Sequence, residues 1–597
     1  MAFSVGNSQP RFARPSLYLA ASLIFFLIPG AAISQQAGSS ADAEKFYAQG
    51  MAAAGNGDLA AARKAFEAAV QADPQSAQAH NMLGTVLLAQ GELKPAIAEL
   101  QQAISLQPSF PEAHLNLSRA FARDGDVPSA VREARASVEI APEVAEAHHV
   151  LAHALASSGD LQGATASIQR AIELNPSSAE YHDDLGSLLV QLGKFTDAIP
   201  EYLEALKLDP DFPPAHLHLG VVYFQQKDFE RAVAELQRAT QLSPQNYLAF
   251  AYLGSAQRER GDRDAAITAF QSSVKVNPDQ PDTQNQLGLL LQRAGRTDEA
   301  VAAFREVVRL QPSNADAQNN LGLALLQIGD GAGSIAAFQA ALQLAPDNTA
   351  YRQNLGDAYL QKADFAAAVS EFQTAIEHDP KNPALHYDLG LALKMEDKLP
   401  EAATEFRKAE TLDPSQPDAF FTLGITLWQQ GDFDGAVREL RSAIHVKPDY
   451  TEAYYTLGTV LKQQGKLSEA AEALREAIRL QPDYPAVHTT LAAVLRQSGD
   501  TQGAAEQARI GSELAKRATD LQAAVFATNS GRRLRKTGDL EGAISQFRAA
   551  LTATPDYAPA HFELGLALQQ QGKKEEAHQE LQRANQLDAH YPAPSDN

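Results

Sequence analysis

The sequence predicts an all-α protein, built as an α-solenoid of helix-turn-helix units. Thirteen prolines recur at a constant spacing of 34 residues, from Pro74 to Pro482. A leucine, usually followed by glycine, recurs in the same frame from Leu83 to Leu491. The chain has 597 residues and is 45 % apolar, but it contains only 25 Phe, 16 Tyr and one Trp. Several separate aromatic cores are therefore disfavoured, and stacking of like units is the expected way to bury apolar surface.

The first 34 residues predict an export signal. Arg11 and Arg14 precede an apolar run over 17–28, which is followed by a Pro-Gly pair and small residues up to Ser34. Twelve apolar residues are fewer than the roughly 20 needed to span a bilayer, so we expect cleavage after Ser34. The mature protein would then be periplasmic or secreted, with a linker at 35–42. Membrane contact is expected only if the signal is retained.

Each unit is expected to be a helix, a two-residue turn and a second helix. Glycines such as Gly91 can end the first helix in the left-handed conformation. Asp126, Asp262 and Asp432 can cap the second helix, and the phased proline ends it. Lys227, Ala363 and Asp397 replace the turn glycine, so we expect slight strain in those three units.

The domain boundaries follow from counting in this frame. Units 1–14 occupy 43–518, an insertion or lengthened helix junction occupies 519–523, units 15 and 16 occupy 524–591, and 592–597 form a tail. The stretch around the insertion contains good helix formers and no proline, which favours a lengthened helix. A tolerated insertion at a solvent-facing turn and a functional hinge both remain open.

The Leu-Gly, Ala, Phe and Pro positions together resemble the tetratricopeptide repeat (TPR), and the resemblance covers nearly the whole chain. It implies a right-handed superhelix whose first helices line a concave groove that binds a peptide or a protein. We therefore expect a non-enzymatic protein-protein interaction scaffold. The alternative is a component of a secretion, envelope or polysaccharide-export machine, tethered to the inner membrane by an uncleaved signal. A metal-dependent enzyme is a third hypothesis, and the oligomeric state stays open.

Composition excludes several classes of function. The formal charge is −23, with 50 Lys and Arg against 73 Asp and Glu, and such a surface repels nucleic acid. The absence of cysteine excludes thiol nucleophiles and cysteine zinc sites. The 48 residues outside the units are too few for a catalytic domain, and no glycine-rich phosphate loop is present. No cofactor is expected.

One constellation has metal-ligand character. His149 and His153 lie four residues apart on one predicted helix, and Asp183 and Asp184 follow one period later. The resemblance would point His149, His153 and Asp183 into the groove, as a candidate zinc set. Packing is the main interpretation, however, because histidine recurs at the fourth position of the unit. These residues are His80, His114, His148, His182 and His216.

Two sets of residues are candidates for contact with a partner. The first is a group of asparagines at positions that hydrogen-bond an extended peptide in related proteins, although such residues can equally cap or solvate a helix. These are Asn285, Asn319, Asn320 and Asn354. The second is an aromatic row at the fifth position of three consecutive units, Tyr387, Phe421 and Tyr455, with Trp428 at a twelfth position. Burial against the adjoining helix is the alternative for these rings.

A dense basic cluster precedes Gly538. Its members are Arg532, Arg533, Arg535 and Lys536. Cations in the last turns of a helix interact favourably with the helix dipole, and this accounts for most of the cluster. Docking of an anionic segment is the minority hypothesis.

Overall fold

The computed structural model describes residues 41–592, and these residues form 31 α-helices and no β-strands. The expectation of an all-α repeat solenoid is confirmed. The proposed signal at 1–34, the linker residues up to 40 and the tail from 593 lie outside the described residues. Within the described part of the chain, no helix is long and apolar enough to cross a membrane.

The chain divides into two compact parts, residues 1–296 and 297–597. From here on these two parts are called unit 1 and unit 2, and each 34-residue helix-turn-helix element is called a repeat. The helices of unit 1 are α1 (Ala41–Gly55), α2 (Leu59–Ala72), α3 (Ala77–Ala89), α4 (Leu93–Leu106), α5 (Pro111–Asp124), α6 (Val127–Ile140), α7 (Ala145–Ser158), α8 (Leu161–Leu174), α9 (Ala179–Gln191), α10 (Phe195–Leu208), α11 (Pro213–Gln225), α12 (Phe229–Leu242), α13 (Tyr247–Arg260), α14 (Arg263–Val276) and α15 (Pro281–Arg293).

Unit 2 continues the same alternation. Its helices are α16 (Thr297–Leu310), α17 (Ala315–Gln327), α18 (Gly331–Leu344), α19 (Thr349–Gln361), α20 (Phe365–His378), α21 (Pro383–Met395), α22 (Leu399–Leu412), α23 (Pro417–Gln429), α24 (Phe433–Val446), α25 (Thr451–Gln463), α26 (Leu467–Leu480), α27 (Pro485–Gln497), α28 (Thr501–Lys536), α29 (Leu540–Ala553), α30 (Ala558–Gln570) and α31 (Lys574–Leu587).

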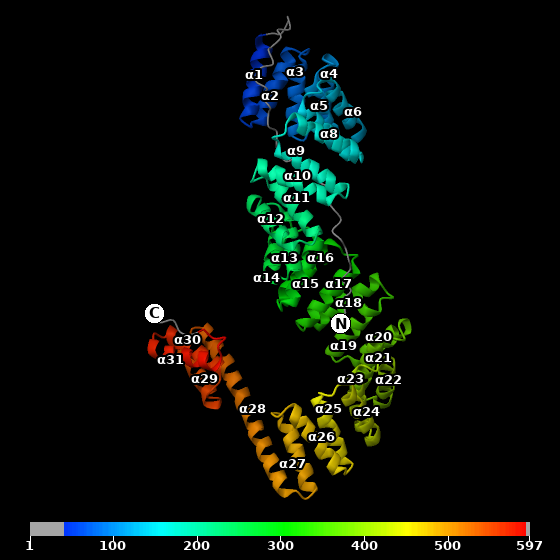
Figure 1. Ribbon diagram of the computed structural model, residues 1–597, viewed down its shortest axis with the longest axis vertical. Coiled ribbons are helices and arrows are strands. Elements are labelled where there is room, and N and C mark those ends of the chain that lie inside the picture. The colour runs from blue at the N-terminus through cyan, green and yellow to red at the C-terminus, as the bar shows by residue number, and fades with distance from the viewer. Residues whose placement is uncertain (1–40, 593–597) are drawn as a thin grey trace. The chain divides into compact units, whose positions relative to one another are not determined.

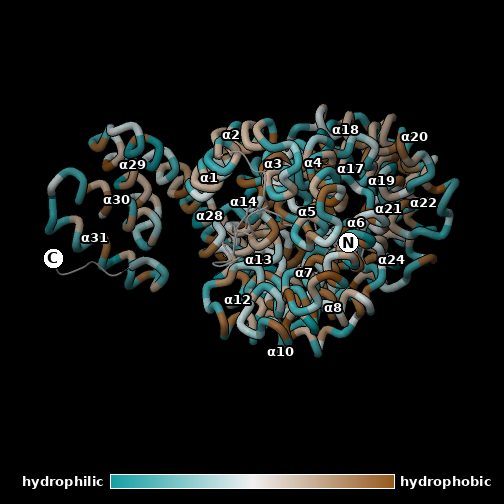
Figure 2. Tube along the Cα trace, turned by 90° about the horizontal axis from the view of Figure 1, so that it is seen from above, coloured by the Kyte–Doolittle hydropathy of each residue, from teal (hydrophilic) through white to brown (hydrophobic). Residues whose placement is uncertain are grey.

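Within each unit, consecutive helices stack on one another (Figure 1). Apolar and hydrophilic residues alternate along the tube of the chain, as expected where one side of many helices packs against its neighbours (Figure 2). The apolar faces meet in an extended core. One buried cluster runs from Ala54 to Leu188 in unit 1, and another runs from Ala368 to Ala504 in unit 2. The core therefore continues from repeat to repeat, as stacking of incomplete units requires.

Small residues let the two helices of a repeat approach closely. Gly322 on α17 faces the ring of Phe338 on α18, which is fully buried. A Cβ atom at residue 322 would lie 2.5 Å from that ring. The Leu-Gly pair of the sequence pattern therefore exists because an aromatic or leucine side chain of the second helix fills the space beside the glycine.

The turns keep one backbone conformation whatever residue occupies them. Lys227, Ala363 and Asp397 replace glycine, and their φ angles are 62°, 60° and 62°. These values lie in the left-handed region that side chains other than glycine disfavour. Stacking of the neighbouring helices therefore imposes the turn, and the strain expected from the sequence is present at these three positions.

The predicted aspartate caps are present in two of three cases. Asp126 accepts a hydrogen bond from the backbone N–H of Ser129, and Asp432 accepts one from Gly435. The prediction for Asp262 is wrong, because this side chain makes no capping hydrogen bond. Its carboxylate instead accepts a hydrogen bond from Arg260. A guanidinium near the cap thus competes with the backbone for the same carboxylate.

The one long helix of the described chain is α28, with 36 residues. It is an unbroken ribbon that packs beside α27 over one part and beside α29 over another (Figure 1). The residues 519–523, where the sequence pattern breaks, lie inside it. Three large apolar side chains at or just after this stretch remain exposed: Leu521, Val525 and Phe526.

Candidate functional site

Polar and aromatic side chains of consecutive first helices meet in pairs that are 35 residues apart. We call this row the first-helix ladder. The fifth residue of one repeat contacts the sixth residue of the next. The pairs are Asn81–Asn116, His149–Asp184, Asp183–His218, Asn319–Asn354, Gln353–Asp388 and Tyr387–Thr422.

The pairing offset exceeds the sequence period by one residue. Side chains that contact each other on neighbouring first helices therefore do not occupy equivalent positions of the repeat. A third ladder residue, one turn after the fifth, joins several pairs. Thr85 accepts a hydrogen bond from Asn116 at 3.0 Å in this way. Where this third residue is polar, a rung brings together three side chains from two repeats.

The rung between α7 and α9 contains two imidazoles and a carboxylate. Nε2 of His149 lies 2.7 Å from Oδ2 of Asp184, and Nε2 of His153 lies 3.0 Å from the same oxygen. The two Nε2 atoms are 2.9 Å apart. His149 is buried, with 6 % of its surface exposed, whereas the side chain of His153 is 41 % exposed. Three potential ligand atoms therefore converge on one point.

A second group of side chains surrounds His149 on its other side. Nδ1 of His149 lies 3.5 Å from Oε2 of Glu146 and makes no hydrogen bond. Tyr181 donates a hydrogen bond to the same carboxylate oxygen at 3.0 Å, and Arg119 contacts the other oxygen of Glu146. Glu146 is thus fixed from two sides while it faces the imidazole.

Charge interactions dominate the protonation of this group. Burial favours neutral side chains, but the contacts with His149, Arg119 and Tyr181 outweigh it and lower the pKa of Glu146 to about 2. Burial also opposes a charge on His149, but Asp184 and Glu146 outweigh it and raise its pKa to about 10. The pKa of Asp184 is lowered, because the two histidines outweigh its burial. Without a bound cation, His149 is an imidazolium between two carboxylates.

The candidate metal set predicted from the sequence is wrong in one residue. Asp184, not Asp183, joins His149 and His153. The prediction assumed that residues one period of 34 apart lie side by side, whereas the ladder pairs residues 35 apart. Asp183 instead accepts a hydrogen bond from Nδ1 of His218 on α11 at 2.9 Å. Burial raises the pKa of Asp183, with His218 acting in the opposite direction.

The fourth-position histidines have the packing role expected for them. Nδ1 of His114 lies 2.8 Å from Oε2 of Glu133, on the second helix of the same repeat. Its Nε2 lies 3.0 Å from the carbonyl oxygen of Pro108, which ends the preceding repeat. Other repeats make the same pair of contacts, as at His80, His216, His386 and His561. This histidine links the helices of a repeat to the proline before it.

The candidate asparagines lie on the ladder. Asn354 donates a hydrogen bond to Oδ1 of Asn319 at 2.8 Å, so these two side chains form a rung of unit 2. Asn320 is the next residue on α17, and Asn285 lies on α15 of unit 1. All four occupy the fifth or sixth position of a repeat. Their role in binding a peptide stays a prediction.

The aromatic row is half-buried, and each ring packs against a ring of another element. Tyr387 lies 5.6 Å from Phe406, Phe421 lies 4.9 Å from Tyr450, and Tyr455 lies 5.5 Å from Tyr484, measured between ring centroids. None of these ring pairs joins two of the three fifth-position aromatics to each other. Each ring instead covers the edge of the core with one side.

Trp428 has one polar contact. Its indole N–H donates a hydrogen bond to Oε1 of Gln463, 35 residues later, at 2.7 Å. The ladder offset therefore also holds about two helical turns beyond the fifth and sixth positions. The ring itself packs on the edge of the same core cluster as the three fifth-position aromatics.

The basic cluster of α28 is largely engaged in intramolecular contacts. Arg532 and Arg535 donate hydrogen bonds to the two oxygens of Glu563 on α30, at 2.8 Å and 3.0 Å. Arg533 and Lys536 lie in the last turn of α28, where the helix dipole favours positive charge. The packing interpretation of this cluster therefore accounts for its members.

Sequence reasoning missed Glu146, Tyr181 and Arg119. Tyr181 follows Glu146 by 35 residues, so the ladder offset would have paired them. The same offset pairs Gln353 with Asp388, another rung that was missed. A scan for polar residues 31 and 35 apart, rather than 34 apart, is the signal that would have found Glu146, Tyr181 and the Gln353–Asp388 pair. Arg119 lies 27 residues before Glu146 and would need a further offset.

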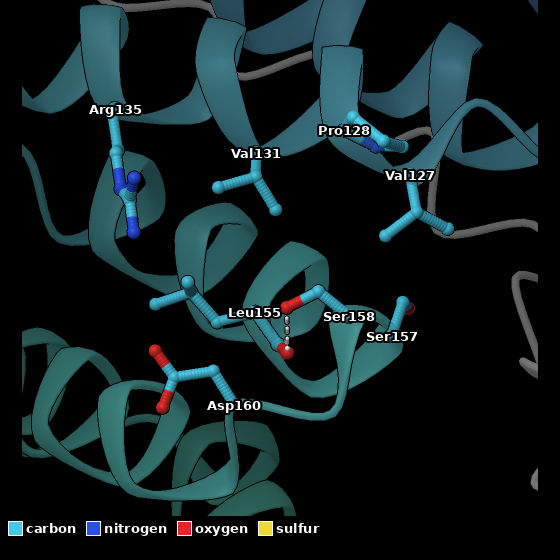
Figure 3. Close-up of a pocket in the computed structure, with 8 residues that line it drawn as sticks. All are labelled: Val127, Pro128, Val131, Arg135, Leu155, Ser157, Ser158 and Asp160. Carbon is cyan, nitrogen blue, oxygen red and sulfur yellow. Dashed lines mark hydrogen bonds between the residues drawn. The ribbon is translucent and has the colours of Figure 1, made fainter.

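One depression among the described residues is wide open to solvent, and it lies apart from the ladder. Val127, Pro128 and Val131 of α6 line it on one side, and Leu155, Ser157, Ser158 and Asp160 line it on the other, with Arg135 at its rim (Figure 3). The hydroxyl of Ser158 donates to the carbonyl of Leu155 at 2.7 Å. The depression offers no convergent set of reactive groups, so the ladder is the better candidate site.

Comparison with solved structures finds repeat proteins of modest similarity. MamA is 26 % identical over 27 % of this chain and 95 % of its own, with a TM-score of 0.26. YrrB, described as a TPR protein with an unusual peptide-binding site, is 22 % identical over 31 % of this chain and 96 % of its own, with a TM-score of 0.27. A repeat protein from Parabacteroides merdae is 17 % identical over 42 % of this chain and all of its own, with a TM-score of 0.36.

Comparison with curated protein sequences gives no match. Models of the tetratricopeptide repeat, in contrast, match most of the described chain. The matched residues are 47–109, 81–145, 115–179, 184–247, 223–290, 285–349, 354–417, 421–485, 455–511, 531–572 and 558–591. Together with the helix-turn-helix architecture and the ladder of first helices, these matches show that the chain belongs to the tetratricopeptide repeat family.

Proposed function

We propose that the chain is a non-enzymatic scaffold that binds a peptide or a protein segment along its first-helix ladder, within a concave groove. The observation that carries this proposal is the contrast between two kinds of position. Packing positions repeat nearly unchanged, such as the buried Phe338, Phe372 and Phe406. Ladder positions differ from rung to rung. A surface that varies on a constant framework is the arrangement by which repeat proteins distinguish partners.

The ladder of unit 2 supplies two means of binding an extended segment. Asn319 and Asn354 present amide groups, which can donate to and accept from a peptide backbone. Phe421 and Tyr455 present one side of a half-buried ring, and rings held in this way lose little conformational freedom on binding. The net charge of −23 favours segments that are neutral or basic.

The test uses a random peptide display library and the full chain. Selected peptides are synthesised, and their affinity is measured by calorimetry for wild type, Phe421→Ala and the matched core variant Phe406→Ala. We expect Phe421→Ala to weaken binding by about 2 kcal/mol, roughly 30-fold, with little loss of stability. Phe406 is fully buried, so its truncation should cost about 3 to 5 kcal/mol of folding stability. A lowered melting temperature of Phe421→Ala with unchanged affinity overturns the aromatic anchor.

We further propose that the scaffold acts in the periplasm or outside the cell. Support comes from the basic residues Arg11 and Arg14, the apolar run 17–28 and the small residues before Ser34. The intact mass of the protein recovered from the cell envelope tests this proposal. A chain beginning near residue 35 supports export with cleavage. A chain that still begins at Met1 overturns cleavage and supports the membrane-tethered assembly component instead.

A further inference from the structure

The α7–α9 rung has a geometry that hydrogen bonding alone does not explain. Two imidazole Nε2 atoms face each other at 2.9 Å, and both face Oδ2 of Asp184, at 2.7 and 3.0 Å. Each Nε2 carries at most one hydrogen, and the carboxylate oxygen of Asp184 only accepts. At most two of the three edges of this triangle can therefore be hydrogen bonds, and the third short contact is left without one.

A divalent cation satisfies all three atoms at once. Zn²⁺ binds imidazole nitrogen and carboxylate oxygen at about 2.0 to 2.2 Å, and tetrahedral angles then separate two ligand atoms by roughly 3.3 Å. The three separations of 2.7, 2.9 and 3.0 Å need to open by only a few tenths of an ångström. The spacing of the two histidines by one helical turn places both on the same face of α7.

The surroundings match those of a metal-bound histidine. Such a histidine usually directs its second ring nitrogen to a carboxylate, which fixes the ring. Nδ1 of His149 is buried, has no hydrogen-bond partner and lies 3.5 Å from Oε2 of Glu146. Tyr181 and Arg119 hold that carboxylate in place. His149, the less accessible of the two histidines, thus has the carboxylate of Glu146 beside its second ring nitrogen.

Other rungs of the same geometry lack this donor set. The equivalent positions hold Asn81, Thr85 and Asn116 in one rung, and Gln353, Asp357 and Asp388 in another. Among the described residues 41–592, the group His149, His153 and Asp184 is the one cluster whose ligand atoms converge in this way. Its composition is therefore specific to one junction and is not a property of the repeat.

We propose that His149, His153 and Asp184 bind one Zn²⁺ ion that joins α7 to α9. The ion links two consecutive repeats, in place of the one to three hydrogen bonds that link the other rungs. A fourth coordination position remains on the side of His153, whose side chain is 41 % exposed, and it is filled by water. This inference is independent of the peptide-binding proposal, because it concerns a different rung and needs no partner.

The experiment measures Zn²⁺ binding to the full chain without a polyhistidine tag, after removal of metal by a chelator. Calorimetry gives the stoichiometry and affinity, and Co²⁺ substitution gives the visible spectrum of the site. We expect one ion per chain and a Co²⁺ spectrum of tetrahedral intensity. His153→Ala and Asp184→Asn should each weaken binding at least tenfold. Glu146→Gln should weaken it about 10- to 100-fold, as loss of an orienting group does.

His148→Ala is the matched control on the same helix. Nε2 of His148 lies 2.9 Å from the carbonyl oxygen of Pro142, and the residue is not part of the rung. Its substitution should leave Zn²⁺ affinity unchanged. Circular dichroism verifies that each variant is folded, and the half-exposed His153 keeps the test valid if Asp184→Asn does not fold. Less than one ion per chain in wild type, or equal affinity in His153→Ala and wild type, overturns the proposal.

Discussion

The same three ladder positions hold contrasting chemistry in the two units. In unit 1, His149 and His153 share one oxygen of Asp184, and the carboxyl groups there have lowered pKa values. In unit 2, the equivalent rung holds Gln353 and two carboxyl groups. Burial and the charge of Asp388 raise the pKa of Asp357 to about 7. Burial also raises the pKa of Asp388 to about 6, although Gln353 donates a hydrogen bond to it at 2.7 Å.

This difference shows that the repeat determines where the ladder side chains lie but not which residues they are. The period, the turns and the core place three side chains at every rung, whatever their identity. The identity then decides whether the rung attracts a cation or takes up protons. Function in this chain is therefore expected to vary rung by rung, and experiments on one rung should not affect distant ones.

The largest expected effect is a difference in folding stability between variants that each remove one side chain from one of the two rungs. His149→Ala leaves Glu146 and Asp184 without the group that lies between them, and breaking a buried ion pair costs about 3 to 5 kcal/mol. Gln353→Ala removes a single neutral donor and should cost about 1 kcal/mol. Chemical denaturation with a chelator present measures both. Equal losses would mean that the two rungs do not differ in the way their contacts indicate.

A core variant tests whether such effects stay local. Leu321 on α17 is 8 % exposed, and its truncation to alanine should cost about 2 to 5 kcal/mol. We expect the unfolding transition to split. Hydrogen exchange should become faster in α17–α19 and remain unchanged in α7–α9. A single transition, with faster exchange throughout both units, would contradict nearest-neighbour stability and remove the basis for comparing rungs one by one.

The fold was predictable because the 34-residue period directly indicates a stack of helical repeats. Phased prolines, turn glycines and the Leu-Gly pair each have a local physical role, and the helices lie where those residues place them. The fourth-position histidines were also predictable, because both of their partners lie at fixed offsets within the same frame. His114, for example, contacts Pro108 and Glu133. These features depend on contacts within one repeat or at its immediate border.

The site was less predictable, because it depends on how one repeat is shifted against the next. A period of 34 gives the order of the repeats. It does not show that side chains in contact are 35 residues apart, which is why His149 contacts Asp184 and not Asp183. The capping role of Asp262 failed for a related reason, since Arg260 competes for its carboxylate. Contacts between side chains of adjacent elements decide such outcomes, and the sequence pattern does not contain them.

The pH dependence of folding stability should reveal the raised carboxyl pKa values of the unit 2 rung. The fold raises the pKa of Asp357 and so disfavours its charged form, with Asp388 and Gln353 as its ladder neighbours. The resulting penalty is full above about pH 7, fades as the pH falls, and is absent below the unfolded pKa near 3.8. The α19–α21 region should therefore gain stability, on the order of 1 kcal/mol after allowance for solvent screening, between pH 8 and pH 5.

Asp357→Asn should remove this gain by stabilising the region at pH 8. Asp449→Asn, at an exposed carboxylate in the turn before α25, is the control and should leave the pH profile unchanged. Denaturant midpoints at the two pH values, with exchange rates of α19–α21, measure the effect. A wild-type region that loses stability as the pH falls to 5 would show that the carboxyl pair is charged in the fold.

The smallest effect concerns the fourth position, where Arg352 stands in place of histidine. Arg352 donates to Glu371 and to the carbonyl oxygen of Pro346, both at 2.9 Å, and His386 contacts Glu405 and Pro380 in the same manner one repeat later. Because histidine at this position satisfies the same two acceptors, Arg352→His should change the free energy of unfolding by less than about 0.5 kcal/mol. Arg352→Leu satisfies neither acceptor and should cost about 1 to 3 kcal/mol. Paired denaturation curves compare the two variants, and equal losses would show that the acceptors at this position are not interchangeable between repeats.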